Sequence, residues 1–136
     1  MKINSFYPVV MTDELKACAN FFIKYFGFRI TFEADWYISM IDENNNELAF
    51  LKHNHETVPT GFRALQSGLL LNIELDNVDE IYDLFIKDLR DKIRLDIKSE
   101  SFGQRHFIIE APGKLLVDVI QIIEPSEEYK ENYEQE

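Results

Sequence analysis

Histidines are the first side chains in this sequence whose types and spacing could do chemistry. His53 and His55 form a His-x-His pair, and imidazole is the commonest nitrogen ligand for metal ions in proteins. The pair stands beside Glu56 and Pro59, a composition equally typical of a polar connecting loop, and we favour the loop. His106 lies within a strand-like run, so its side chain can face either side of a sheet.

Polar side chains interrupt three other strand-like runs. Side chains alternate between the two faces of a sheet. In these runs the apolar side chains suit a face that a helix covers, so the polar ones lie on the other face. They are Glu47, Asn72, Glu74 and Asp118. Carboxylates brought together away from water are unfavourable unless a cation or hydrogen-bond donors offset their charge. The pattern predicts a site for a cationic or amine-rich ligand, and the alternative is that Glu47 and Glu74 lie at a solvated rim.

Arg105 and Trp36 complete the candidate ligand-binding set. Glu47 and Glu74 could pair with Arg105 or Arg29, and Arg105 could equally bind a ligand carboxylate by a two-point contact. Trp36, the single tryptophan, offers a large apolar surface and a ring face for cations. The sequence contains no Gly-x-Ser-x-Gly, no phosphate-binding glycine loop and no His-Glu-x-x-His, so the catalytic residues are unknown.

An internal repeat organises the elements that must position these residues. Phe22-Ile23-Lys24 recurs as Phe85-Ile86-Lys87, an offset of 63 residues. The same offset relates two apolar stripes with helical spacing: Leu15, Cys18, Phe22 and Phe26, and Val78, Ile81, Phe85 and Leu89. The chain is therefore built from two similar modules, and the position of Cys18 in a stripe indicates a buried small hydrophobe.

Each module is predicted to run strand, helix, then three strands. The first has strands at 6–11, 29–34, 36–41 and 47–52, with a helix that begins at Thr12 or Asp13 and ends at Gly27. The second has strands at 69–75, 93–98, 104–110 and 115–123, with a helix that begins at Asn77. The modules span 5–52 and 68–123, residues 53–67 link them, and an acidic tail at 124–136 is expected to be solvated.

These elements predict an α+β fold in which the whole chain, 1–136, is a single domain. Each helix buries its apolar stripe on one face of its own sheet. The two βαβββ modules then form a half-open, curved mixed sheet, whose other face lines a central cleft for a small ligand.

Three motifs resemble the glyoxalase/bleomycin-resistance/extradiol-dioxygenase superfamily, also called vicinal oxygen chelate. Residues 21–28, Phe-Phe-Ile-Lys-Tyr-Phe-Gly-Phe, are similar to the family's aromatic pair and Phe-Gly-Phe at the end of the first helix. Residues 102–107 are similar to its Trp-Gly-Gln-Arg stretch. Residues 111–121 are similar to its Asp-Pro-x-Gly ending, here one residue shorter and without the first Asp.

The resemblance also locates the positions where metal-dependent members carry their ligands. They fall on Phe6 or Tyr7, Ala49, Leu70 and Asp118. Because only Asp118 is an ordinary ligand for a divalent ion, we expect a protein without cofactor that sequesters a small molecule, as antibiotic-resistance members do. The alternative is a lyase, isomerase or dioxygenase that binds one divalent metal ion through a rearranged set: Glu47, Glu74, His106 and Asp118.

Composition limits the classes of binding partner and the cellular setting that we expect. With 14 basic and 25 acidic residues the net charge is −11, which argues against binding nucleic acid. No apolar run is long enough to cross a membrane, and a single cysteine suits a reducing, cytoplasmic setting. The resemblance further implies a homodimer.

Overall fold

The computed structural model describes residues 1–134 and divides them into two compact units. The first unit consists of residues 1–68 with 112–114, and the second of residues 69–111 with those from 115 onward. Each unit contains one four-stranded sheet and one long helix in the order strand, helix, strand, strand, strand. The predicted α+β class and the repeated βαβββ order are confirmed; the single domain and its cleft stay predictions.

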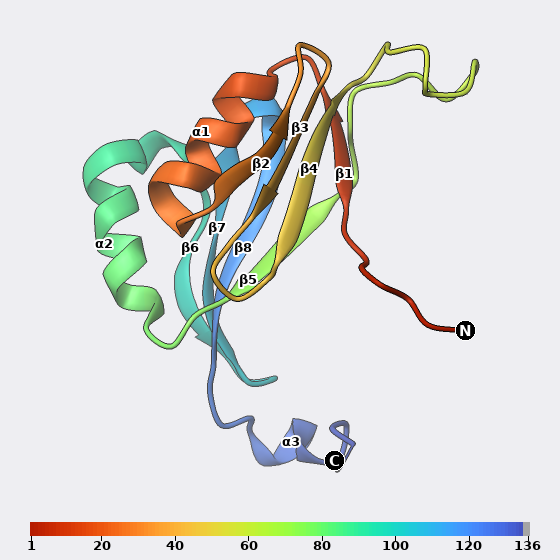
Figure 1. Cartoon of the computed structure of the whole chain (residues 1–136). Helices are drawn as coiled ribbons and strands as arrows, with labels where there is room; N and C mark the ends of the chain where they lie inside the picture. Colours follow the sequence, from red (N-terminus) through yellow and green to blue (C-terminus); the bar gives the residue numbers. More distant parts are fainter. Residues whose placement is uncertain (135–136) are drawn as a thin grey trace. The chain divides into compact units, whose positions relative to one another are not determined.

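The first unit carries its helix on one face of a mixed sheet (Figure 1). Its elements are β1 (Val9–Thr12), α1 (Leu15–Phe26), β2 (Arg29–Glu33), β3 (Tyr37–Ile41) and β4 (Glu47–Lys52). The strand order is β1-β4-β3-β2, with β1 parallel to β4 and the other pairs antiparallel. α1 packs on β3 and β4, and the Phe22 ring lies 5.8 Å from that of Phe50.

The ends of α1 show one correct and one wrong prediction. Gly27 caps the C-terminus in the left-handed conformation at φ 70°, as expected of glycine there. Neither Thr12 nor Asp13 is the N-cap, because β1 continues through Thr12, which pairs with Lys52. The Thr12 hydroxyl instead accepts a hydrogen bond from the Glu14 N–H at 3.0 Å.

The second unit repeats the arrangement. Its elements are β5 (Leu70–Glu74), α2 (Val78–Leu89), a 3₁₀ turn (Arg90–Lys92), β6 (Ile93–Glu100), β7 (Gln104–Ala111), β8 (Leu115–Ile122) and the short α3 (Glu127–Lys130). The strand order is β5-β8-β7-β6, with β5 parallel to β8 and the other pairs antiparallel. α2 packs on β6, β7 and β8.

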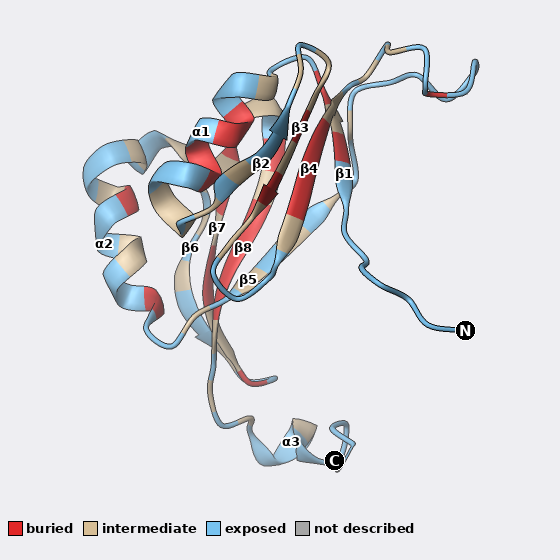
Figure 2. Ribbon diagram, in the orientation of Figure 1, coloured by how far each residue is buried: buried red, intermediate tan, exposed pale blue. Residues whose placement is uncertain are grey.

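Buried side chains follow the predicted alternation (Figure 2). In β7 and β8, Phe107, Val117 and Val119 are fully buried on the face that α2 covers; the Phe107 ring lies 5.8 Å from Phe85 of α2. α2 begins after Asn77, as predicted. The first N–H of α2 is satisfied from β8: Val78 N–H donates a hydrogen bond to the Gln121 side-chain oxygen at 3.0 Å.

A turn at Pro112–Lys114 (3₁₀) belongs to the first unit. Gly113 donates its N–H to the Glu14 carboxylate at 3.0 Å, and its carbonyl accepts a hydrogen bond from Gln66 at 3.0 Å. Gly113 has φ 75°, and a Cβ there would lie 2.9 Å from the Thr12 hydroxyl. Glycine is therefore required at this turn both by conformation and by space.

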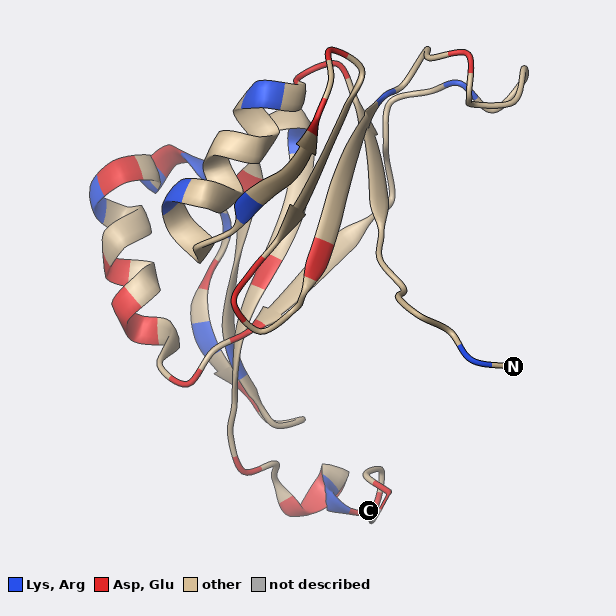
Figure 3. Ribbon diagram, viewed as in Figure 1, with Lys and Arg blue, Asp and Glu red and all other residues tan. Residues whose placement is uncertain are grey.

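The acidic tail is mostly exposed through residue 134, and it includes α3, whose first turn is acidic (Figure 3). Part of the tail contacts the loop between β6 and β7, where the Ser126 N–H donates to the Ser101 carbonyl; residues 135 and 136 of the predicted tail lie outside the described residues. Tyr129 and Tyr133 give the tail an aromatic contact and a hydrogen bond to the loop, which composition alone did not indicate.

Candidate functional site

The second sheet has a polar group on the face that α2 leaves uncovered. Register pairs Asn72 with Asp118, Glu74 with Ile120, and Ile120 with His106. Paired residues point to the same side of a sheet, so this face holds four predicted site residues: Asn72, Glu74, His106 and Asp118. The predicted alternation in β5 and β8 is therefore supported.

Three of the side chains on this face form a hydrogen-bonded chain. His106 Nδ1 lies 2.7 Å from Asp118 Oδ1, and its Nε2 lies 2.9 Å from Glu100 Oε2. Lys98 Nζ lies 3.4 Å from the same Glu100 oxygen. His106 and Asp118 are buried at 5% and 6% exposure, whereas Glu100 is half-buried. We call Glu100, His106 and Asp118 the carboxylate–histidine chain.

The two carboxylates favour the protonated form of the His106 imidazole. Burial by itself lowers the pKa of His106, but the hydrogen bonds to Glu100 and Asp118 and their charges outweigh it, so the net shift is above 6.5. The hydrogen bond from His106, together with nearby Lys98, lowers the pKa of Glu100. In the protonated form both ring nitrogens donate, and the imidazolium then lies between two carboxylates.

This donor set does not fit a metal ion. A metal-bound imidazole must offer a nitrogen lone pair, and both His106 nitrogens are already engaged with carboxylates. Within residues 1–134 no group of three or more His, Cys, Asp or Glu side chains could hold a metal ion. We therefore derive no step through a metal for the rearranged set Glu47, Glu74, His106 and Asp118.

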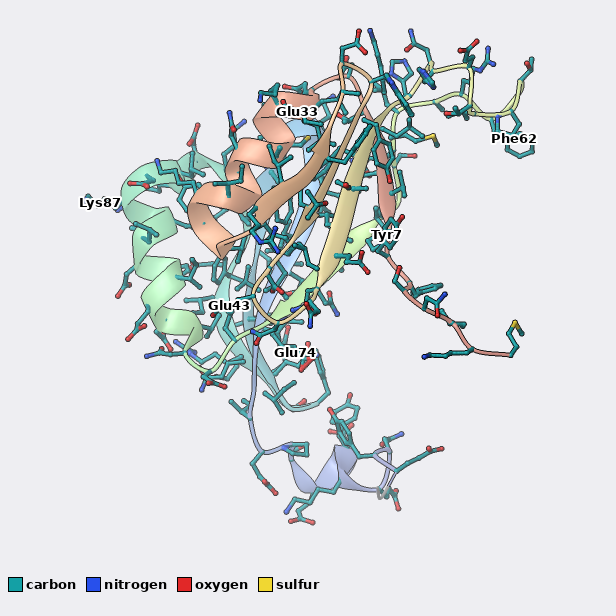
Figure 4. The ribbon with its side chains drawn as sticks, in the orientation of Figure 1. Tyr7, Glu33, Glu43, Phe62, Glu74 and Lys87 are labelled. Atoms are coloured by element: carbon teal, nitrogen blue, oxygen red, sulfur yellow. The ribbon has the colours of Figure 1, made fainter. Side chains whose placement is uncertain are left out.

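Asn72 and Glu74 remain open for a ligand on the same face. Both are exposed, and Glu74 lies where β5 ends (Figure 4). Among the described residues neither makes a side-chain hydrogen bond or ion pair. Leu70, 45% exposed, and the half-buried Leu116 adjoin them in register. The face thus combines an unneutralised carboxylate with apolar surface.

Arg105 lies on the opposite face of β7 from His106, and its role in ligand binding stays a prediction. It donates two hydrogen bonds to the Asp79 carboxylate, at 2.8 and 3.1 Å, and a third to Ser99 at 3.2 Å. Asp79 stands in the first turn of α2, and the pair with Arg105 lowers its pKa. The neighbours His106 and Arg105 point to opposite sides of β7 because strand side chains alternate. Neither Glu47 nor Glu74 pairs with Arg105.

The first unit holds Trp36 and Glu47. Trp36 immediately precedes β3 and stacks on His55, with ring centroids 4.0 Å apart and an interplanar angle of 8°. One ring face is thereby covered. Glu47 begins β4 opposite Ile41 and is half-buried. The roles of Trp36 and Glu47 in ligand binding stay predictions.

A shallow depression of about 770 Å³ lies at the start of α1. Its charged rim is marked by Glu33 (Figure 4), which pairs with Lys16 at 2.6 Å. Acidic Asp13 and Asp35 also line it. None of the predicted site residues lines this depression.

Glu100 is the site residue that sequence reasoning missed. The strand was predicted to end at Lys98, whereas β6 continues to Glu100, which pairs with Gln104. Counting two residues beyond Lys98 puts Glu100 on the Lys98 face. Had the predicted strand been extended by two residues, side-chain alternation would have placed Glu100 among the site residues.

Comparison with solved structures identifies the architecture. No family model matches the sequence, and no curated protein matches it significantly. A glyoxalase/bleomycin resistance protein/dioxygenase family enzyme from Burkholderia phytofirmans superposes with a TM-score of 0.72 over 86% of this chain and 97% of its own, at 16% identity. The chain has the glyoxalase/bleomycin resistance/dioxygenase fold.

Two further structures agree with this fold. The lactoylglutathione lyase of Agrobacterium tumefaciens matches with a TM-score of 0.67 over 89% of this chain and 96% of its own, at 14% identity. A possible glyoxalase from Bacillus cereus matches with a TM-score of 0.62 over 84% and 95%, at 16% identity. The resemblance read from the three motifs is thus confirmed for the fold. None of the helices in the described part of the chain is long and apolar enough to span a membrane.

Proposed function

We propose that this protein binds and sequesters a small organic molecule that carries an amine and an apolar body, without a metal ion. The ligand lies on the uncovered face of the second sheet, with its cation at Glu74 and Asn72 and its apolar part along Leu70 and Leu116. The proposal extends to this chain the capture function of antibiotic-resistance members of the fold.

One observation carries the proposal. Asp118 stands at the position where the resemblance implies a metal ligand, and here its charge is balanced by His106 inside the face. Glu74, on the same face, has no such partner within the described residues and is exposed. A ligand cation would supply the missing opposite charge, and the negative net charge of the chain would attract it.

The test uses matched probes of one shape: 4-phenylbutylamine, 4-phenylbutanol and 4-phenylbutyrate. Amide chemical shifts of β5 and β8 should change saturably with the amine, less with the alcohol and least with the acid. Glu74→Gln should weaken amine binding by roughly two- to fivefold, since a solvent-exposed charge pair contributes about 0.4–1 kcal/mol.

The control is Glu80→Gln, which removes another exposed carboxylate, from α2. It should leave amine binding unchanged. Equal binding of all three probes, or equal losses in the two variants, would contradict the proposal. A cytoplasmic setting and a homodimer belong to the same proposal; light scattering on the purified protein tests the dimer.

A further inference from the structure

The loop between β6 and β7 is tied down by the C-terminal segment 123–134. All three loop carbonyls accept a hydrogen bond from it. Ile123 N–H donates to Gly103 O at 2.9 Å, and Ser126 N–H donates to Ser101 O at 2.8 Å. The Tyr133 hydroxyl donates to Phe102 O. Backbone carbonyls that would otherwise need water are thus satisfied by one segment.

Aromatic contacts continue from this segment to the carboxylate–histidine chain. The Tyr129 ring meets the Phe102 ring edge-on, with centroids 6.2 Å apart. Phe102 in turn meets the His106 ring, with centroids 6.3 Å apart and an interplanar angle of 72°. Edge-to-face pairs of this kind have preferred geometry, and the Phe102 ring contacts both Tyr129 and His106.

Gly103 permits the close approach of the segment. It is buried and has φ 109°, and a Cβ there would lie 3.0 Å from the Tyr133 hydroxyl and 3.3 Å from Ile123 O. Its N–H donates to the carbonyl of Glu100 at 3.1 Å. The loop therefore connects the segment to the backbone of Glu100, whose carboxylate binds His106.

We propose that the C-terminal segment is a strap, in which Tyr129 and Tyr133 are positioning residues that hold Glu100 and Phe102 against His106. When the strap is attached, the His106 ring is hydrogen-bonded at both nitrogens and covered at one edge. When it is released, the loop moves and His106 becomes accessible. The strap goes beyond ligand binding, and its test needs no ligand.

Diethyl pyrocarbonate is a suitable probe because it acylates accessible, unprotonated imidazole. The chain has three histidines, and peptide mass spectrometry gives a separate rate for each. His53 and His55 lie in the other unit and serve as internal references. In the unaltered protein His106 should react slowest.

The double variant Tyr129→Ala with Tyr133→Phe should raise the His106 rate by about tenfold, the shift in a local opening equilibrium expected when one hydrogen bond and one aromatic contact are lost. The rates of His53 and His55 should not change. Tyr133→Phe alone removes only the hydroxyl and should give a smaller rise, and it keeps the test usable if the double variant does not fold.

Two further variants distinguish release of the strap from a general loss of protein stability. Glu131→Gln, an exposed change in the same segment, should leave all three rates unchanged. Glu100→Gln should raise the His106 rate by itself, and adding Tyr133→Phe should then add little, because both act through one contact. An unchanged His106 rate in the double variant, or a parallel rise at all three histidines, would overturn the proposal.

Discussion

The carboxylate–histidine chain should show strong energetic coupling between His106 and Asp118. Both are more than nine-tenths buried and joined at 2.7 Å. Replacing His106 by leucine leaves the Asp118 carboxylate buried without its cation, which costs about 3 kcal/mol of unfolding free energy, the lower end of the range for breaking a buried pair. Asp118→Leu should cost a similar amount, because the imidazolium then loses its most buried partner.

The double variant gives the sharper result. Its two leucines would lie beside Ile108 and Ile120, which share the face, and a buried ion pair replaced by apolar side chains is often neutral in stability. We therefore expect the double variant to be no less stable than either single variant. That outcome corresponds to a coupling free energy of about 3 kcal/mol.

Urea unfolding followed by far-UV circular dichroism is the appropriate assay. The single tryptophan lies in the first unit, so its fluorescence would miss the second unit. Ile120→Val is the matched control, with an expected loss of about 1 kcal/mol for one buried methyl group. If each single variant stays within about 0.5 kcal/mol of the unaltered protein, or if the losses simply add, the reasoning is refuted.

Three other predictions follow from the contacts described. The pKa of His106 is raised in the folded protein. The stabilisation that His106 contributes is therefore complete below about pH 6.5, the pKa of an unfolded histidine, and is lost as pH rises through the folded pKa. Urea unfolding at a series of pH values should show this fall in stability for the unaltered protein and not for His106→Leu. Gly113→Ala should cost about 2 kcal/mol in the same assay, because the new Cβ adds a clash to backbone strain. Gly61→Ala, also at positive φ but in open space, should cost less; equal losses would contradict the clash. Burial raises the pKa of the Cys18 thiol to about 11, so iodoacetamide at pH 8 should label it only after unfolding; prompt labelling of the folded protein would show that the thiol is accessible.

Local pattern was sufficient for most of the fold. Helical spacing located both helices, and Gly27 marked the end of the first because a left-handed cap favours glycine. Alternation placed Asn72, Glu74 and Asp118 on one face of the second sheet, as the register shows. These features depend on neighbours within one or two turns or pleats, and the sequence lists those neighbours directly.

The hydrogen-bond partners of individual side chains were harder to predict from the sequence. Pairing with Glu47 or Glu74 was one option considered for Arg105, but its guanidinium binds Asp79, 26 residues away. Composition also gave no sign that the Tyr133 hydroxyl donates to the carbonyl of Phe102, 31 residues away. In both cases several acceptors were chemically suitable, and only the packing of α2 on its sheet and of the C-terminal segment on the β6–β7 loop selected one.

The sequence by itself determined the repeated βαβββ order, the apolar stripes and the face on which most of the second unit's polar site residues lie, because periodicity and turn chemistry are local properties. The tertiary structure alone decided that His106 joins Asp118 to Glu100, and that the tail holds the loop beside them. Those contacts join different strands or segments, and their formation depends on strand register and close packing, which local preferences do not specify.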